Sequence, residues 1–486
     1  MVRHLQTLTF LIPLILAGCS GSSSSTGSDA CAGVACSSHG SCKSAGAGAY
    51  CVCDNGYSTS GLSCVATTGS CQGITCSGHG SCADSGGTPT CTCESGYAAS
   101  GMACNATNGP CVGVTCSGHG TCTSVGTAAS CTCDSGYVAS APTTCEPTVA
   151  PVIGGCQVLP SNHVFNTPID SLPAHPNSSA FIATIGTHRI HLDLGVSTDI
   201  TSSEYYGIPY NVVHGGAITW SPVNFGSTDP DMSWDPRSES DCSVLSDSSH
   251  KIVSPCTTAA AANPAMPIPP SPLVEGGIDR TASQPYGDHH MLLLDVDTCR
   301  LWELYHCYPN TSGGWDIFGA ATFDLKSNML RPADWTSADA AGFPILPLLL
   351  RADEATSGAI HHAMRFTIQS SKIRNQYVWP ARHLTSNGTT SQNLPPMGQL
   401  FRLKASYVIP TAAGSQARAI LQALKTYGMY IADGGSDLYI QGEPSAAWTD
   451  DTFSVVQSVT TDQFEAVDTA PIQQRPGFDV NSAAVP

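Results

Sequence analysis

The stretch CSGHGSC at residues 76–82 decides the organisation of the first third of this 486-residue chain. The same seven positions read CSSHGSC at 36–42 and CSGHGTC at 116–122. Self-similarity at a fixed period of this size is the signature of a repeat array, in which each copy is one small structural unit. We therefore expect three copies of one module at the front of the chain.

Each copy carries six cysteines with the spacing C-x4-C-x5-C-x8-C-x-C-x10-C, and the last gap of the third copy is one residue longer. The modules span residues 31–64, 71–104 and 111–145. A module this small buries too little apolar surface to fold without crosslinks. In an exported chain, we expect such cysteines to form disulfides and not a metal site. Six cysteines allow fifteen pairings, so spacing alone leaves the connectivity open.

The run C-x-C-x-x-G-Y in every copy resembles EGF-like modules. The resemblance implies that the first cysteine pairs with the third, the second with the fourth and the fifth with the sixth. The implied disulfides are Cys31–Cys42, Cys36–Cys51, Cys53–Cys64, Cys71–Cys82, Cys76–Cys91, Cys93–Cys104, Cys111–Cys122, Cys116–Cys131 and Cys133–Cys145.

Calcium is not expected in these modules, because no Asp-x-Asp/Asn-Glu pattern precedes the first cysteine of any copy. One histidine recurs in each copy, as His39, His79 and His119, and duplication of a loop residue explains it without a shared metal. We interpret the array as a stalk. Ligand binding by the modules is the alternative.

The chain begins with a basic residue pair and an apolar run at 8–18, which is short for a membrane span and typical of a secretion signal. Leu16-Ala17-Gly18-Cys19 resembles the signal of bacterial lipoproteins, in which the chain is cut before a lipidated cysteine. Two or three acyl chains on such a cysteine anchor a protein firmly to a membrane. We expect a signal peptide at 1–18, a lipid on Cys19, a Ser/Gly tether at 19–30 and, in a diderm host, an outer-membrane address. An ordinary signal peptide is the alternative.

The formal net charge is −18, from 37 acidic and 19 basic residues. No Lys/Arg block is present to neutralise phosphates, so the composition excludes a nucleic-acid partner. No later apolar run approaches transmembrane length.

From about residue 150 the dense cysteine pattern stops and alternating apolar runs begin. We expect a linker at 146–157, one globular domain at 158–470 and a disordered tail at 471–486. Strand patterns dominate, with one amphipathic helix from Ser415 to Tyr427 and a second, short helix from Ser337. The predicted fold is mainly β, a sandwich-like domain with a few edge helices. Its predicted strand segments are 289–307 (a hairpin), 359–368, 399–409 and 427–442 (a hairpin with its turn at 433–435).

Five cysteines remain in this domain, at 156, 242, 256, 299 and 307, so one thiol stays unpaired within the chain. Cys242 and Cys256 are close enough in sequence to staple a loop. Eight strand steps between Cys299 and Cys307 are too long for a disulfide. Cys156 is then the partner of one of these two.

Polar residues gather at the ends of the predicted strands. If two of these strands are neighbours, several side chains converge on one cleft and suit general acid–base chemistry. The predicted catalytic residues are Asp288, His290, Glu303, His362 and His383. The histidines of this set together with Glu303 also suit a divalent metal, although the sequence itself requires no cofactor. Asp288 and Glu303 form a candidate carboxylate pair of the glycosidase type. The predicted substrate contacts are Tyr286, Tyr305, Trp379 and Arg382. Hydrogen-bonded strand histidines and core aromatics are the alternative interpretation.

Segments such as NHVFNTPID (162–170) and DHHMLLLDVD (288–297) resemble a domain of secreted soil-bacterial proteins that has no established activity. The resemblance covers about 158–469 and implies one continuous domain. No nucleophile elbow, phosphate loop or dinucleotide fingerprint occurs. Three functions remain: a surface enzyme that hydrolyses or eliminates polysaccharide, a non-catalytic glycan-binding or adhesion protein, and a structural envelope protein.

Overall fold

The computed structural model describes residues 31–486 except 32–33, 46–47, 54–56, 61, 67–70, 72–73, 75, 77–78, 86–87, 95–96, 101, 107–108, 119, 126–127, 134–136, 142, 148–149, 226–234, 258–260, 279–286 and 386–387. The predicted signal peptide, the tether, Cys19, His119 and Tyr286 lie outside the described residues. The chain divides into two compact units, with the boundary between Ser130 and Cys131. No helix of the described residues is long and apolar enough to cross a membrane.

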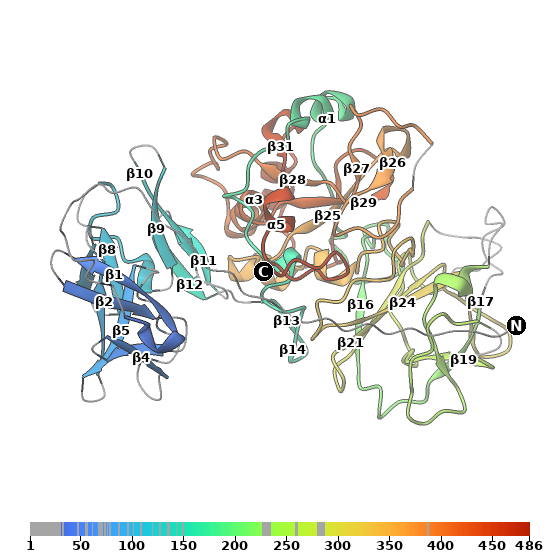
Figure 1. Cartoon of the computed structure of the whole chain (residues 1–486). Coiled ribbons are helices and arrows are strands. Elements are labelled where there is room, and N and C mark those ends of the chain that lie inside the picture. The colour runs from blue at the N-terminus through green and yellow to red at the C-terminus, as the bar shows by residue number, and fades with distance from the viewer. Residues whose placement is uncertain are drawn as a thin grey trace, which may run out of the picture. The chain divides into compact units, whose positions relative to one another are not determined.

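Each repeat is built from two antiparallel hairpins (Figure 1). Short 3-10 helices, η1 (Cys36–Ser38) and η3 (Cys116–Gly118), precede the hairpins of the first and third repeats. The hairpins are β1 (Gly40–Ala45) with β2 (Gly48–Cys53), β3 (Tyr57–Ser60) with β4 (Ser63–Ala66), β5 (Gly80–Ser85) with β6 (Thr88–Cys93), β7 (Tyr97–Ser100) with β8 (Ala103–Ala106), β9 (Gly120–Val125) with β10 (Ala128–Cys133), and β11 (Tyr137–Ala141) with β12 (Thr144–Pro147).

Disulfides take the place of an apolar core in these repeats. Cys116, Cys131 and Cys145 of the third repeat are all disulfide-bonded. The buried cysteines themselves form the hydrophobic clusters of the first two repeats. The described bridges are the pairs that the EGF-like resemblance implies: Cys31–Cys42, Cys36–Cys51, Cys53–Cys64, Cys71–Cys82, Cys76–Cys91, Cys93–Cys104 and Cys111–Cys122.

The repeated His-Gly pair has a packing role. The ring of His79 stacks on Tyr97 with centroids 3.9 Å apart, and His39 stacks on Tyr57 at 4.0 Å. A Cβ added at Gly80 would lie 2.6 Å from the Cys104 sulfur and would also meet a backbone carbonyl. Only glycine fits there, because β5 presses against the opposite strand and a disulfide. The seven-residue repeat therefore maintains the module rather than a chemical site.

The second unit holds three larger sheets (Figure 1). The six-stranded sheet has the order β15 (His191–Asp193), β30 (Tyr439–Gln441), β25 (Met364–Ile368), β29 (Met429–Gly434), β28 (Leu400–Leu403), β31 (Phe464–Ala466). The four-stranded sheet has the order β16 (Tyr210–Val213), β20 (Met291–Asp295), β21 (Arg300–Tyr305), β24 (Gly319–Asp324). The five-stranded sheet has the order β18 (Ser243–Val244), β19 (Pro264–Met266), β17 (Ser221–Phe225), β23 (Trp315–Ile317), β22 (Tyr308–Pro309).

Two small ladders and short helices complete the unit. The ladders are β13 (Val152–Ile153) with β14 (Cys156–Gln157), and β26 (Arg374–Tyr377) with β27 (Pro396–Met397). The α-helices are α1 (Ser178–Ile185), α2 (Ala352–Ser357), α3 (Ser415–Thr426), α4 (Asp450–Val456) and α5 (Ala470–Gln473). The 3-10 helices are η4 (Val164–Asn166), η5 (Pro236–Glu239), η6 (Leu346–Leu348), η7 (Ser370–Lys372) and η8 (Thr461–Gln463). The predicted mainly β fold with few helices is confirmed.

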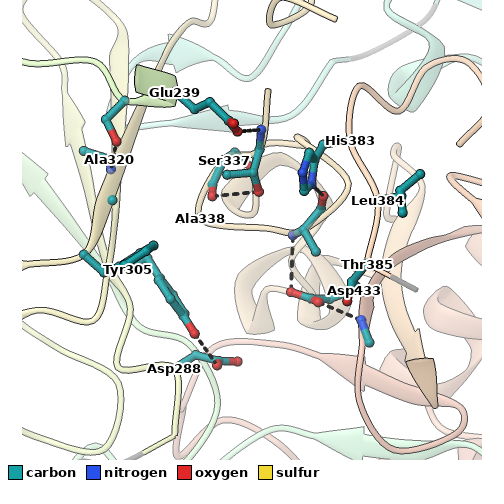
Figure 2. A pocket seen from close by; sticks show the side chains of 16 residues that line it. Glu239, Asp288, Tyr305, Ala320, Ser337, Ala338, His383, Leu384, Thr385 and Asp433 are labelled. Atoms are coloured by element: carbon teal, nitrogen blue, oxygen red, sulfur yellow. Dashed lines mark hydrogen bonds between the residues drawn. The ribbon is translucent and has the colours of Figure 1, made fainter. Parts of the chain in front are cut away.

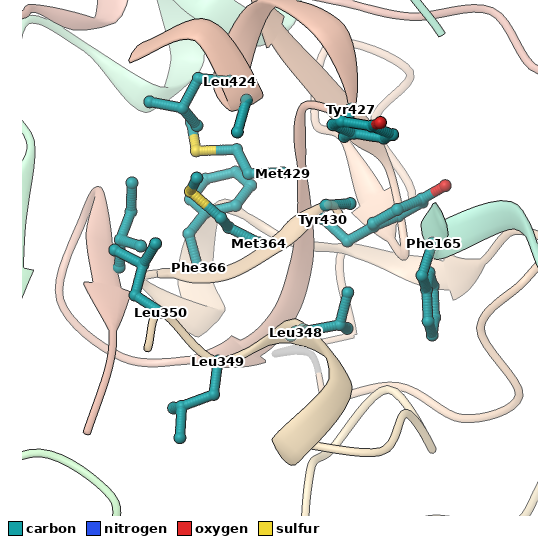
Figure 3. Packing of buried hydrophobic residues seen from close by; sticks show 14 of the residues in the cluster. Phe165, Leu348, Leu349, Leu350, Met364, Phe366, Leu424, Tyr427, Met429 and Tyr430 are labelled. Carbon is teal, nitrogen blue, oxygen red and sulfur yellow. The ribbon is translucent and has the colours of Figure 1, made fainter. Parts of the chain in front are cut away.

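The largest core joins α3 to the six-stranded sheet. Figure 3 shows Leu424 of α3 above Met364 and Phe366 of β25, with Met429 of β29 beside them. All four side chains are buried. This packing explains why the helix predicted from its apolar stripe forms, since burial of that stripe supplies most of a helix's stability in a protein. A second, separate core lies between the four- and five-stranded sheets and includes Trp302.

The predicted hairpin at 427–442 is wrong in its pairing. β29 and β30 both form from this segment, but β25 lies between them, parallel to β29 and antiparallel to β30. The pattern showed two strands and a turn, and it could not show that a third strand inserts. The helix predicted from Ser337 is also wrong, because residues 336–342 form a loop held by side-chain hydrogen bonds of Ser337 to Asp339 and Phe343.

The predicted linker and tail both belong to the folded unit. Ile153 of the linker is buried, and Cys156 forms a disulfide with Cys299. At the other end, Ala483 and Val485 are buried in the largest core. The predicted disordered tail is therefore wrong, because buried side chains, Ile472 among them, and backbone hydrogen bonds order this segment. Cys242–Cys256 is the second described disulfide of the domain that follows the repeats, and Cys307 is a buried free thiol.

Candidate functional site

A cavity of about 470 Å³ opens in the second unit, and segments far apart in sequence form its walls (Figure 2). The walls come from the end of η5, from Asp288 just before β20, and from the facing ends of β21 and β24. The loop 336–340, the segment 383–385 and the end of β29 complete them. The lining residues are Glu239, Ser240, Asp288, Tyr305, Phe318, Gly319, Ala320, Thr336, Ser337, Ala338, Ala340, His383, Leu384, Thr385, Asp433 and Gly434.

Among the acids that line the cavity, Asp433 has the most strongly shifted pKa. It follows the buried apolar run of β29 and accepts hydrogen bonds from the amides of Gly434 (2.6 Å) and Ala340 (3.3 Å). Burial raises the pKa of Asp433 to about 7, and the charges of Asp339 and Asp288 act in the same direction. A carboxyl group that keeps its proton near neutral pH can act as a general acid.

Asp288 supplies a second carboxylate to the same cavity. It is exposed, and its Oδ1 accepts a hydrogen bond from the Tyr305 hydroxyl at 3.2 Å. Tyr305 and Phe318, also in the wall, have rings in an edge-to-face arrangement with centroids 6.0 Å apart. The cavity therefore combines two acids with aromatic surface.

A buried ion pair lies behind this wall. Arg365 of β25 donates from Nε and Nη2 to the two carboxylate oxygens of Asp339, both at 3.0 Å. Both side chains are buried. This bidentate geometry satisfies the guanidinium inside the protein, so Arg365 is not free to bind a ligand in the cavity.

His290 is the first predicted catalytic residue that the structure places elsewhere. Its ring lies buried between the Glu275 carboxylate (Nδ1, 2.7 Å) and the Ala338 carbonyl (Nε2, 2.9 Å). Both partners only accept, so both ring nitrogens carry protons. Burial lowers the pKa of His290, but Glu275 outweighs it and raises the pKa to about 9. The imidazolium supports the wall at Ala338 and does not line the cavity.

Glu303 and His362 are also structural. Glu303 is fully buried in β21 and accepts hydrogen bonds from the amides of Ile345 (2.8 Å) and Leu346 (2.9 Å). Burial raises its pKa to about 7. The predicted Asp288–Glu303 catalytic pair is therefore wrong, because the carboxyl group of Glu303 is used to cap a backbone turn. His362 lies in a different buried cluster, 3.0 Å from Glu354, which also pairs with Arg351.

Two predicted substrate contacts hold the C-terminus instead. The Trp379 indole donates to the Ser482 carbonyl at 2.9 Å, and Arg382 donates to the Val480 carbonyl at 2.9 Å and to Asn481. Tyr305 does line the cavity, and Tyr286 lies outside the described residues.

His383 remains as predicted in the cavity wall. Its Nδ1 donates to the Ala340 carbonyl at 2.9 Å, because a carbonyl oxygen only accepts, and this bond holds the ring in the wall. The cavity thus brings together Asp288, Tyr305 and His383 of the predicted residues. The sequence pattern did not indicate Asp433 or Glu239, since Asp433 stands in an apparent hairpin turn and Glu239 in a short polar stretch without periodicity.

The predicted convergence of histidines on a metal does not form. Among the described residues, one group of three potential ligands has its donor atoms within 4.8 Å of one another: Cys116, Cys131 and Cys145. All three are disulfide-bonded, so none offers a thiolate.

No protein-family model matches this chain, and no curated protein matches it significantly. Its function must therefore be argued from the cavity.

Proposed function

We propose that this chain is a bacterial surface lipoprotein in which three EGF-like modules carry a domain that hydrolyses extracellular polysaccharide. The observation that carries the catalytic part is the pairing of two acids in one cavity. Asp433 holds a proton up to about pH 7, and Asp288 lies in the same wall with its carboxylate exposed.

Glycoside hydrolysis needs this division of labour between two carboxyl groups. The Asp433 carboxyl would donate its proton to the glycosidic oxygen as the bond to the anomeric carbon breaks. Asp288 would supply the second carboxylate, as the base for the attacking water or as the nucleophile. Tyr305 and Phe318 offer the aromatic surface on which sugar rings stack through their C–H faces.

A polysaccharide panel tests the proposal on the purified full chain, with retention and release of reducing ends both measured. Asp433→Asn should lower the rate of release at least 10²-fold, since a positioned general acid contributes about that much. Asp288→Asn should do the same. Asp199→Asn is the matched control, because Asp199 is exposed, bonds to Thr201 and does not line the cavity.

The pH dependence of reducing-end release is a second test of the same proposal. Release by the wild-type chain should fall as the pH rises through about 7, because Asp433 then loses its proton. Retention without release would favour a glycan-binding protein. The absence of both retention and release would favour a structural envelope protein.

The anchor has its own test. Cys19→Ser should move the protein from the membrane fraction to the soluble fraction, because lipid chains on Cys19 would hold it there. Continued membrane fractionation would contradict lipidation.

A further inference from the structure

We infer that the cavity selects a glycan with free amino groups, a polymer of glucosamine type, over neutral and acidic glycans. The inference rests on the proposed function, because it names the substrate class of the same site.

The charge of the wall is the first observation. Three carboxyl side chains line the cavity, from Glu239, Asp288 and Asp433, and no Lys or Arg is among its described lining residues. Because Asp433 holds its proton for the reaction, a uronate or phosphate group would meet the carboxylates of Glu239 and Asp288 and would find no lining cation to pair with. An ammonium group would find several partners.

Two buried guanidinium groups that contact the segments of the wall are satisfied elsewhere. Arg365 is held by Asp339 in the bidentate pair described above. Arg331, beneath the loop that carries Thr336, donates to Asp241 (2.6 Å) and to the carbonyls of Glu239 and Thr336. Both arginines are buried. Neither guanidinium is therefore free to pair with an anionic ligand in the cavity.

The hydrogen-bonding sense of the wall points the same way. Glu239 accepts at Oε2 from the Thr336 amide (3.0 Å), and its other oxygen can accept from a ligand. Asp288 accepts at Oδ1 from the Tyr305 hydroxyl, and its other oxygen can likewise accept from a ligand. An ammonium group has three donors and no acceptor, which complements a wall of acceptors.

Glu239 is separated from the two acids of the proposed reaction. Figure 2 shows it on the side of the cavity opposite Asp288 and Asp433. An amine bound at Glu239 would therefore hold one sugar in place and would leave Asp433 and Asp288 to the scissile bond. We assign Glu239 as the specificity-determining residue.

The test compares soluble oligomers of glucosamine with the same oligomers after N-acetylation, and with a uronic acid polymer, using the full chain at pH 6. We expect kcat/KM for the free amine to exceed that for the acetylated oligomer at least tenfold. The preference should shrink as NaCl is raised, because salt screens a charge pair that is open to solvent.

Glu239→Gln should remove most of that tenfold preference through a higher KM for the amine. The glutamine oxygen can still accept from the Thr336 amide, so a melting temperature within a few degrees of wild type is expected. Glu204→Gln, an exposed glutamate outside the cavity wall, is the matched control.

The outcomes separate the two proposals. Release from acetylated or acidic polymers without preference for the amine would overturn this inference and leave the hydrolase standing. Retention of the amine polymer with no release from any glycan would overturn the hydrolase and support amine recognition. Neither release nor retention would overturn both.

Discussion

At the scale of single residues, burial of the Asp433 carboxyl group makes its ionised form unfavourable, and the proposed reaction uses the proton that the group therefore keeps. A carboxyl group with a folded-state pKa of about 7, against an ordinary value of 3.8, favours the folded state most when it is protonated. That contribution is complete below the unfolded pKa and is lost as the pH rises to about 7.

Asp433→Asn should therefore gain stability relative to wild type between pH 4 and pH 8 while it loses turnover. We expect a gain of about 1–2 kcal/mol at pH 8, a discounted figure because the group is partly exposed. Urea unfolding at the two pH values measures it. Asp199→Asn should show no gain at pH 8, and equal stability of Asp433→Asn and wild type throughout would contradict the assigned pKa.

At the scale of elements, a buried imidazolium joins the start of β20 to the loop at Ala338. The His290–Glu275 pair has a nitrogen–oxygen distance of 2.7 Å, with His290 only 4 % exposed at its side chain. His214 and Asp297 have the same distance, but the histidine is 69 % exposed. The two pairs differ mainly in solvent access, so they form a natural comparison.

His290→Gln should cost about 3 kcal/mol at pH 6, because it leaves a buried carboxylate without its cation. His214→Gln should cost under about 1 kcal/mol. Since the folded pKa of His290 is raised to about 9, its contribution is complete below 6.5 and is lost as the pH rises through about 9. The difference between wild type and His290→Gln should narrow at pH 10. Chemical denaturation at both pH values checks this, and a difference independent of pH would argue for a neutral ring.

Two disulfides of the domain that follows the repeats close loops of different length. Cys156–Cys299 spans 143 residues and ties the β13–β14 hairpin to the β20–β21 turn, whereas Cys242–Cys256 spans 14. On the chain-entropy view, replacing both cysteines by serine should cost about 5 kcal/mol for the first bridge and about 3 kcal/mol for the second. Urea unfolding of the two double variants measures the ranking. A reversed ranking would show that local packing outweighs loop entropy.

At the scale of the whole molecule, the C-terminal segment completes the second unit. Ala484 forms a β-bridge with His163 near the start of the domain, and the Ser482 carbonyl accepts a hydrogen bond from the Trp379 indole. Ala483 is fully buried, whereas Val480 is 54 % exposed. The ends of the domain are therefore held together by backbone hydrogen bonds and small buried side chains.

Removal of residues 471–486 should expose this core and make the second unit sensitive to protease at 25 °C. Ala483→Asp should have the same effect, because it buries a charge without a partner. Val480→Ala should be tolerated within about 0.5 kcal/mol, as is usual at an exposed site. Limited proteolysis and circular dichroism measure all three. Native protease resistance of the truncated chain would contradict the role given to this segment.

Features governed by local pattern were predictable from the sequence. The cysteine spacing and the EGF-like resemblance indicated the module disulfides, the apolar stripe indicated α3, and the hairpin of β20 and β21 followed from alternation around its turn. Each depends on residues that are near one another in the chain, so local pattern carries the information for the helix and the hairpin, and the family resemblance adds the disulfide pairing. The insertion of β25 between β29 and β30 left no such trace.

The cavity was decided only by the tertiary structure. Asp288 and Asp433 are 145 positions apart. Glu303, which we predicted as the partner of Asp288, turns into the core to meet backbone amides. Whether a carboxyl group is a catalyst or a cap depends on what surrounds it after folding, because desolvation and neighbouring charge set its proton affinity. The chain alone determined which residue types were available, and packing of distant segments determined which of them face solvent together.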